Sequence, residues 1–243
     1  MHKNTLAFVI VAAIGGFVVG FWLANSINRS AVTSGAATGN ASNTAQPTTS
    51  SPNELSAEEI RAKIADADEN PTNYTFQKQL GISLYRYAAT SMDVDLLSEA
   101  VRILSRADAL QSKDFDVLVA LGNAHFDIGF AKKDGVSFQT AREIYSKALL
   151  VKPGDADVVT DLGLTYFLQE PPAYDKAAAE LQKVSDSNPR HERSLQFLVQ
   201  VYLKLGKTAE AERTFAKLKS INPSNTAIPE LTSLIASQTG PQK

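Results

Sequence analysis

The sequence predicts an all-α domain of stacked helix pairs, preceded by a membrane anchor and a polar linker. Three observations lead to this prediction. From residue 54 onward the chain lacks the alternation of apolar and polar residues that is typical of strands. Four segments in this part share one spacing of apolar and small residues, which fits two helices joined by a turn. Near the N-terminus, a run of twenty uncharged residues is long enough to span a bilayer.

The first element, residues 1–24, is predicted to be a transmembrane helix. Residues 5–24 carry no charge and would form about 30 Å of helix, the thickness of the hydrocarbon core of a bilayer. The run ends in Phe21 and Trp22, aromatic residues of the kind found at membrane interfaces. The alternative is a cleaved signal peptide, whose apolar core is usually only about 7 to 15 residues long. Ala24-Asn25-Ser26 is a mediocre cleavage site, so we favour an uncleaved anchor.

The orientation of the anchor depends on few charges. Lys3 precedes the span and Arg29 is the one basic residue that follows it closely. Together with the α-amino group, this balance favours an N-terminus in the cytoplasm and the rest of the chain on the far side of the membrane. For a bacterium, we therefore expect a single-pass protein of the inner membrane with a periplasmic C-terminal domain.

Small residues recur every four positions along the predicted span and form one stripe. Such stripes allow two transmembrane helices to pack closely. A homodimer formed through this stripe remains one alternative, since Gly and Ala are common in membrane spans anyway. The residues of the stripe are Ala12, Gly16, Gly20 and Ala24.

The second element, residues 25–53, is predicted to be a flexible linker rich in Ser, Thr, Asn and Ala. It holds one charge, Arg29, and no aromatic residue, so it cannot bury enough apolar surface to offset the entropy lost on folding. A flexible chain of this length has a root-mean-square reach of about 30 Å.

The third element, residues 54–243, contains the repeated segments. Each has a bulky residue followed by Leu and a small residue, and then, in a second helix, Ala and two further apolar residues. The clearest segment has Leu195, Leu198, Val199, Tyr202, Gly206, Ala211, Phe215, Leu218 and Pro223. The others have Val159, Leu162, Gly163, Tyr166, Ala177, Leu181, Val184 and Pro189; Leu118, Leu121, Gly122, His125, Gly129, Ala141, Tyr145, Ala148 and Pro153; and Gln77, Leu80, Gly81, Leu84, Ala100, Leu104 and Ala107.

These positions resemble the tetratricopeptide-repeat family, whose unit is a 34-residue helix–turn–helix. The resemblance implies a superhelix of about four repeats, although no repeat has the family's Trp at its opening bulky position. The closing positions Ser112, Pro153, Pro189 and Pro223 are separated by 41, 36 and 34 residues. We expect the additional residues in the turns, at 170–173 and around 133–137, with Gly129 as a turn residue. The predicted repeats are 72–112, 114–153, 156–189 and 192–225, with capping helices at 55–69 and 227–237.

Local signals identify several helix ends. Ser56-Ala57-Glu58-Glu59 has the pattern of a capping box, which predicts the start of the first capping helix. Asp155 is expected to be a helix N-cap, and Gly206 is expected to be the turn between the two helices of the last repeat.

Composition and motifs argue against an enzyme. The chain has no Cys, which excludes disulfide modules, thiol catalysis and Cys-ligated metals. Its net charge of −2 does not favour binding to nucleic acid. Gly206-Lys207-Thr208 lacks the earlier Gly of a phosphate-binding loop, and neither His125 nor His191 has a ligand partner at helical spacing. We therefore expect no catalytic residue, metal or cofactor.

The family resemblance also implies a candidate binding site. First-helix positions line the concave side of a tetratricopeptide-repeat superhelix, and here they carry a mixture of apolar, amide and charged side chains that suits an extended peptide or a helix. Because Ile82 stands at an Asn position, the Lys/Asn clamp that some members use for a C-terminal carboxylate is not reproduced. The predicted groove residues are Lys78, Ile82, Tyr85, Arg86, Asn123, Phe126, Asp127, Thr160, Leu164, Phe167, Gln196, Gln200 and Leu203.

The sequence therefore predicts a non-enzymatic scaffold or adaptor, tethered to a membrane, that binds a peptide or helix of a partner protein. By analogy at the level of the fold, it would suit an assembly factor of the bacterial cell envelope. Two alternatives remain: a structural membrane protein that associates with itself, and a non-catalytic subunit of a membrane enzyme or of a cytochrome c maturation complex.

Overall fold

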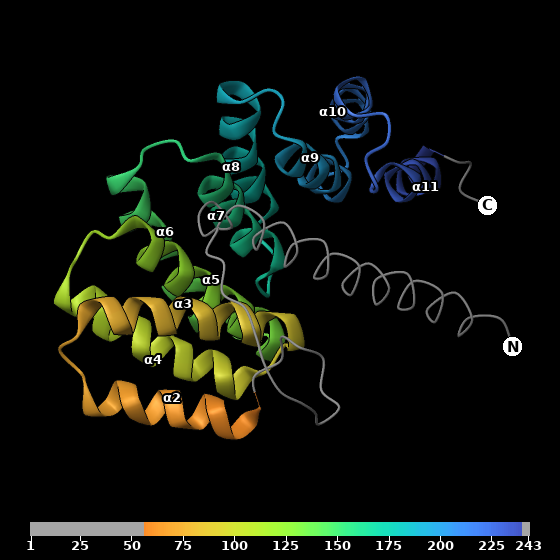
Figure 1. Ribbon diagram of the computed structural model, residues 1–243. Coiled ribbons are helices and arrows are strands. Elements are labelled where there is room, and N and C mark those ends of the chain that lie inside the picture. Colours follow the sequence, from red (N-terminus) through yellow and green to blue (C-terminus); the bar gives the residue numbers. More distant parts are fainter. Residues whose placement is uncertain (1–55, 240–243) are drawn as a thin grey trace, which may run out of the picture.

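The computed structural model describes residues 56–239, which form ten α-helices and no strand. The helices stack as successive hairpins into a curved superhelix (Figure 1), so the predicted all-α superhelix is confirmed for these residues. The helices are α2 (Ala57–Glu69), α3 (Tyr74–Ser91), α4 (Val94–Leu110), α5 (Phe115–Lys132), α6 (Gly135–Val151), α7 (Ala156–Leu168), α8 (Tyr174–Ser187), α9 (Glu192–Lys204), α10 (Thr208–Ile221) and α11 (Ile228–Thr239).

The predicted anchor, with its stripe of small residues, and the predicted linker both lie outside the described residues. Within 56–239, none of the helices combines the length and the apolar character needed to cross a bilayer.

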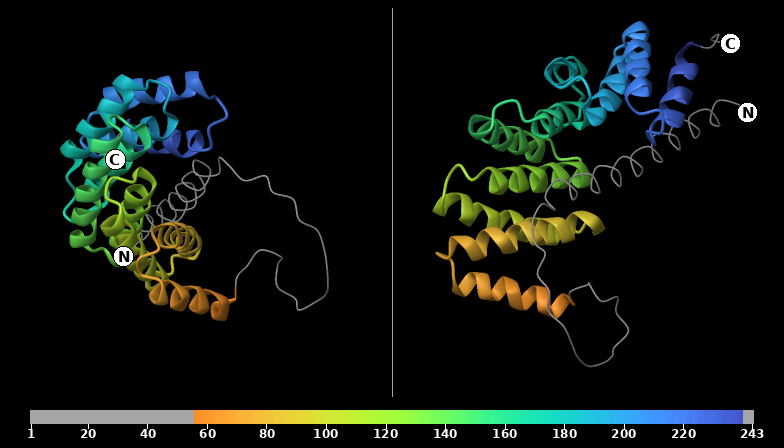
Figure 2. Two further views of the ribbon diagram at one scale, coloured as in Figure 1. Left: turned by 60° about the vertical axis from the view of Figure 1, so that its left-hand side comes forward. Right: turned by 45° about the horizontal axis from the view of Figure 1, so that its top comes forward.

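The superhelix is built from four hairpins, in which α3 pairs with α4, α5 with α6, α7 with α8, and α9 with α10. Each second helix packs on the first helix of the next hairpin, and neighbouring first helices also contact each other. The second helices α4, α6, α8 and α10 do not pack on one another in this way. The first helices are therefore closer together than the second helices, which bends the stack so that α3, α5, α7 and α9 form its inner side (Figure 2).

Small residues allow the two helices of a hairpin to approach closely. A Cβ atom added to Gly81 would lie 2.8 Å from the side chain of Leu104, and one added to Gly122 would lie 2.6 Å from the ring of Tyr145. At Gly163 the distance to Leu181 would be 3.2 Å. The repeated second-helix alanines, Ala100, Ala141, Ala177 and Ala211, are fully buried at 0% exposure. The fourth hairpin replaces the Gly by a buried Val199.

The first two hairpins are longer than the last two, and their additional residues lie in helices. α5 and α6 have 18 and 17 residues, whereas α7 and α8 have 13 and 14. The prediction that the second repeat places its additional residues in a turn around 133–137 is wrong, because α5 ends at Lys132 and α6 begins at Gly135. Both helices are extended at the shared end of the hairpin, so the added turns pack on each other and leave the other contacts in register.

The turns also differ in part from the prediction. Gly129 lies inside α5 and not in a turn; a Cβ atom there would meet Phe138 at 3.1 Å, so this Gly lets α6 begin close to α5. The left-handed residue that ends α5 is Lys133, with φ 53°. Gly206, with φ +69°, does connect α9 to α10 as predicted. The residues between α7 and α8, 169–173, include the predicted insertion.

The helix at the N-terminal end closes the stack with a polar face. The predicted capping box is present, since the Ser56 side chain accepts from the Glu59 N–H at 3.2 Å and the Glu59 carboxylate accepts from the Ser56 N–H at 2.7 Å. We align α2 with α4 by counting back from the first helix that follows each of them, α3 and α5. In this alignment, Glu59, Lys63 and Asp66 of α2 correspond to Ala100, Leu104 and Ala107 of α4. Because charged residues occupy these positions, a further apolar helix cannot pack there without burying them.

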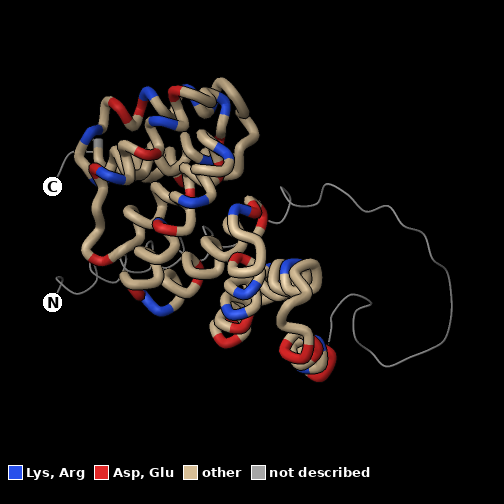
Figure 3. The backbone as a smooth tube through the Cα atoms, turned by 90° about the vertical axis from the view of Figure 1, so that its left-hand side faces the viewer, with Lys and Arg blue, Asp and Glu red and all other residues tan. Residues whose placement is uncertain are grey.

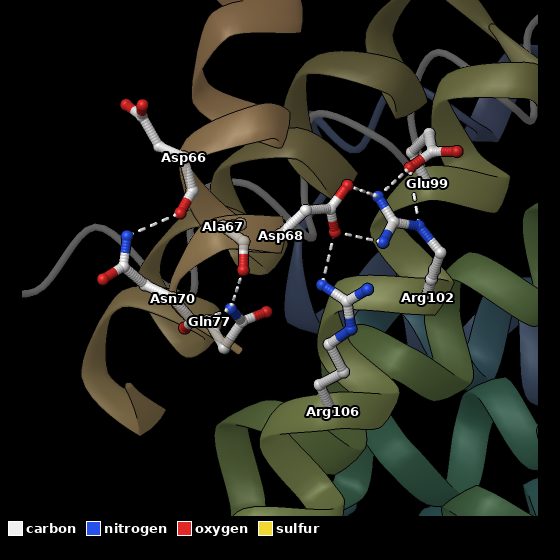
Figure 4. Close-up of polar contacts among 8 residues, drawn as sticks. All are labelled: Asp66, Ala67, Asp68, Asn70, Gln77, Glu99, Arg102 and Arg106. Atoms are coloured by element: carbon white, nitrogen blue, oxygen red, sulfur yellow. Dashed lines mark hydrogen bonds and ion pairs between the residues drawn. The ribbon is translucent and has the colours of Figure 1, made fainter. Parts of the chain in front are cut away.

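Polar contacts hold α2 against the first hairpin (Figure 4). The Asp68 carboxylate pairs with Arg102 and Arg106 of α4, with an Nη2–Oδ2 distance of 3.1 Å to Arg102. Gln77, which stands at the family's Trp position, donates from Nε2 to the carbonyl oxygens of Ala67 at 2.7 Å and Asn70 at 3.0 Å. An amide at this position therefore binds carbonyls that the end of α2 leaves without a partner.

We expect Gly122→Ala to destabilise the domain by about 1–3 kcal/mol, because the added methyl group overpacks the contact with Tyr145. Gly135→Ala is the matched control, since nothing lies within 4 Å of its Cβ position, and it should change stability by no more than about 0.5 kcal/mol. Urea unfolding followed by circular dichroism measures both effects. Equal effects at the two sites would contradict the close approach of α5 and α6.

Hydrogen bonds from Arg102 and Arg106 lower the pKa of Asp68 to about 2. Because this pKa is lower than in the unfolded chain, the carboxylate stabilises the docking of α2 above about pH 4, and its contribution is lost as the pH falls towards 2. An NMR titration of the Asp68 carboxyl carbon should have its midpoint near pH 2. In an Arg102→Gln/Arg106→Gln variant the midpoint should rise, whereas that of Asp134, whose pKa is lowered mainly by Ser137, should not move. An unchanged Asp68 midpoint would contradict the assignment.

Candidate partner-binding groove

The predicted groove residues lie along the four first helices of the inner side, not in one cluster. Four of them, Lys78, Ile82, Arg86 and Gln196, are half-buried. The other nine are buried and expose 8% or less of their surface: Tyr85, Asn123, Phe126, Asp127, Thr160, Leu164, Phe167, Gln200 and Leu203.

Several of the buried residues make contacts within their own hairpin. Phe126 packs edge-to-face on Phe138 of α6, with ring centroids 5.5 Å apart. Phe167 packs on Tyr174 of α8 at 5.7 Å. The Asn123 side chain accepts a hydrogen bond from the hydroxyl group of Tyr145 at 2.7 Å. These residues therefore join first and second helices, and the use of the set as a groove stays a prediction.

A chain of polar contacts, here called the polar seam, follows the N-terminal ends of the first helices. Between α3 and α5, the Lys78 ammonium group lies 2.7 Å from Asp114 and 3.0 Å from Asp116, and the Tyr74 hydroxyl donates to Asp114. Burial, followed by the hydrogen bond to Asp114, raises the pKa of Tyr74 to about 12. Desolvation opposes the charge of Lys78, but its two carboxylate partners raise its pKa overall.

The seam continues between α7 and α9 with a buried ion pair. Arg193, 7% exposed, pairs with Asp161, 2% exposed, and lies 3.8 Å from Asp157. His191 caps α9: its Nδ1 accepts from the Ser194 N–H at 3.3 Å, while Nε2 lies 3.2 Å from the Asp157 carboxylate. In a neutral His191, the proton is therefore assigned to Nε2. Ion pairs as well as apolar packing therefore hold the N-terminal ends of α7 and α9 together.

The last part of the seam joins α9 to the segment before α11. The Glu192 carboxylate accepts from the amides of Asn222 at 2.8 Å and Asn225 at 2.6 Å. Gln196, one of the predicted groove residues, donates to Asn225 at 2.7 Å.

Sequence reasoning did not identify the seam, although a signal for it exists. Asp116, Asp157 and Arg193 are each the second residue of a first helix, so they occupy equivalent positions in successive repeats. Residues at one repeat position lie side by side in neighbouring repeats. Charged residues of opposite sign at such a position predict pairs between repeats.

Charge on the described residues is mixed. Lys and Arg are interspersed with Asp and Glu along the helices (Figure 3). In the segment from 56 to 239, no group of three or more His, Cys, Asp or Glu side chains is arranged to hold a metal ion.

A hollow of about 360 Å³ is lined by residues of α6, α7 and α8. Val159, which takes the family's Trp position in the third repeat, contributes to its wall together with Leu149, Leu162 and Val184.

Comparison with known proteins agrees with this architecture. Residues 173–235, which include α8 to α10 and the first part of α11, match a family model described as tetratricopeptide repeat. A crystal structure of MamA is 25% identical over 68% of this chain and 87% of that chain, with a TM-score of 0.54. The comparisons support the tetratricopeptide-repeat family. No curated protein matches the sequence.

Two further structures share the tetratricopeptide-repeat fold at lower identity. MamA from Desulfovibrio magneticus is 20% identical, covers 70% of this chain and 86% of that chain, and has a TM-score of 0.55. A thermophilic tetratricopeptide-repeat protein of Thermus thermophilus is 21% identical, with coverage of 74% and 88% and a TM-score of 0.52. At this identity the likeness concerns the fold alone.

We expect Arg193→Met to destabilise the fourth hairpin by about 3–5 kcal/mol, because it leaves the Asp161 carboxylate buried without its Arg193 partner. Lys63→Met is the control, since its pair with Asp66 is exposed, and it should cost about 1 kcal/mol or less. In a double-mutant cycle with Asp161→Asn, the coupling should be about 1–3 kcal/mol. Thermal unfolding measures these values; equal losses for Arg193→Met and Lys63→Met would refute a buried, coupled pair.

Proposed function

We propose that the chain is a membrane-tethered scaffold that binds a segment of another protein on the inner side of its tetratricopeptide-repeat stack. The observation that carries this proposal is the curvature of the stack, which gathers the first helices on one side. A peptide or helix laid across this side meets α3, α5, α7 and α9 in turn, and small contacts with each repeat add up.

Both ends of the stack support binding along its length and not at its tips. At one end, α2 presents Glu59, Lys63 and Asp66 at the positions where α4 presents apolar residues. At the other, α11 covers the last apolar cluster with Leu231 and exposes Glu230, Thr232 and Ser233. A stack with two polar ends is suited to act as a single unit that accepts a different chain.

The proposed tether comes from the sequence. Residues 5–24 have the length and apolar character of a membrane anchor, and residues 25–53 have the composition of a flexible linker. In this proposal, the linker lets the repeats search a shell of about 30 Å next to a bacterial inner membrane, on its periplasmic side. High local concentration makes weak binding to other membrane proteins effective, as an assembly factor of the cell envelope requires.

The test is capture of crosslinked partners from membranes by full-length protein. Ile82→Ser/Val119→Ser removes two half-buried apolar side chains from α3 and α5 on the inner side. Val136→Ser/Leu150→Ser is the matched control on α6, where these side chains are 71% and 84% exposed. We expect the first variant to lose at least about 80% of the captured partner and the second to retain it, since apolar anchors dominate such interfaces.

Two measurements guard this experiment. Circular dichroism must give both variants the helix content of the wild type. Carbonate extraction should leave the full-length protein in the membrane pellet; release into the supernatant would disprove the proposed anchor without affecting the groove. Equal capture by the two variants would disprove the groove without affecting the anchor.

A further inference from the structure

Two cationic side chains lie against one aromatic ring at the hairpin end of the third repeat. The Arg142 guanidinium carbon of α6 is 4.7 Å from the centroid of the Tyr166 ring on α7. The Lys176 ammonium nitrogen of α8 is 5.6 Å from the same centroid. Tyr166 is near the C-terminal end of α7, so these groups lie far from the polar seam, which follows the N-terminal ends of the first helices.

Neither cation has an acidic partner within 4.0 Å among residues 56–239. By contrast, three other half-buried or buried arginines, Arg102, Arg106 and Arg193, each pair with a carboxylate. The protein acceptor for Arg142 is neutral: its Nη1 donates to the side-chain oxygen of Gln169 at 3.1 Å. Glu143, its neighbour in the chain, is exposed and accepts instead from Gln139 at 3.2 Å.

The backbone adds positive potential at the same place. Lys176 is in the first turn of α8, where the helix dipole disfavours a cation. The N-cap residue, Ala173, provides no side-chain acceptor for the free N–H groups of this turn, and Asp175 is the one acidic residue there. Desolvation lowers the pKa of Arg142, but a guanidinium remains charged at neutral pH. Positive charge is therefore concentrated here, and within residues 56–239 neither Arg142 nor Lys176 forms an ion pair with the nearby Glu143 or Asp175.

The arrangement leaves N–H groups of the Arg142 guanidinium available to bind a planar anion. The guanidinium lies over the Tyr166 ring, and the one hydrogen bond to Gln169 leaves further N–H donors available. Among residues 56–239, the buried side-chain nitrogen and oxygen atoms without a hydrogen-bond partner do not include any nitrogen of Arg142. A guanidinium held in this way matches the two oxygens of a carboxylate, with an ammonium group close by as a second charge.

We propose that Arg142, Lys176 and Tyr166 form a second contact site, which binds carboxylate side chains of an acidic segment in a partner protein. The site uses the outer end of the hairpin and does not depend on the inner side of the stack. Charge complementarity determines the occupant: two cations without acidic partners favour Asp or Glu, and the neighbouring Tyr166 ring offers apolar surface to the same segment.

The test measures binding of a fluorescently labelled hexaglutamate peptide to the full-length protein in detergent, by anisotropy at low salt. Arg142→Gln/Lys176→Gln removes both charges at the site with little change in size. Lys147→Gln/Lys219→Gln is the matched control, because it removes the same total charge. Lys147 is an exposed residue of α6. Lys219, like the cations of the site, lies over an aromatic ring, with its ammonium nitrogen 5.5 Å from the centroid of Phe215.

We expect the dissociation constant to rise at least about tenfold in Arg142→Gln/Lys176→Gln and less than about threefold in the control. Lys176→Gln alone, which alters an exposed side chain, should raise it about threefold and guards against misfolding of the double variant. Equal weakening in both double variants would overturn the proposal, because it would mean that hexaglutamate senses only net charge. Absence of binding by the wild type at millimolar peptide would overturn it as well.

Discussion

The structure depends on the close approach of the two helices in each hairpin. In the first three hairpins, Gly81, Gly122 and Gly163 face Leu104, Tyr145 and Leu181 at distances that leave no room for a Cβ atom without adjustment. This approach buries the second-helix alanines completely and sets the width of each layer. A hairpin of this kind leaves apolar surface on both flanks, so it is stable only when neighbours cover it, and the stack follows from that requirement.

The polar seam restricts how α5 meets α3 and how α9 meets α7. Apolar packing between layers is tolerant of small rotations, whereas ion pairs and hydrogen bonds to named groups require one geometry. The buried pair of Arg193 and Asp161 lies at α9, the helix that contributes to both hydrophobic clusters. One face of α9 joins the large cluster through Phe197, Leu198 and Val201. Its other face joins the smaller cluster, shared with α10 and α11, through Leu195, Val199 and Leu203. The ion pair between Arg193 and Asp161 therefore fixes the position of α9 in the fourth repeat relative to α7 in the third.

Much of the fold could be predicted because each element carries its own local signal. The capping box at Ser56, the N-cap at Asp155 and the turn at Gly206 depend on interactions within a few residues of the chain, and all three are present. Gly129 misled the prediction because a Gly at a turn and a Gly under a neighbouring aromatic ring look alike in sequence. The space that Phe138 occupies distinguishes them, and it comes from the next helix.

The candidate site was harder to predict for the same reason. Repeat position alone places Asn123 and Phe126 on the inner side, but Tyr145 and Phe138, which engage them, come from the second helix. The pairing of His191 and Arg193 with Asp157, and the sharing of Tyr166 by Arg142 and Lys176, likewise join residues from different helices. Whether a side chain is exposed or already engaged is decided by its neighbours in space.

By itself, the sequence determined the helical class, the repeat and its small-residue positions, because these follow from periodicity and from local backbone preferences. Only the tertiary structure decided where the additional residues of the longer repeats lie, how the layers are clamped and which charges lack a partner. Those features depend on distances between different helices, such as α7 and α9, where Arg193 and Asp161 are 32 residues apart in the chain. Such distances are set by packing of the whole stack and leave no mark on any single stretch of the chain.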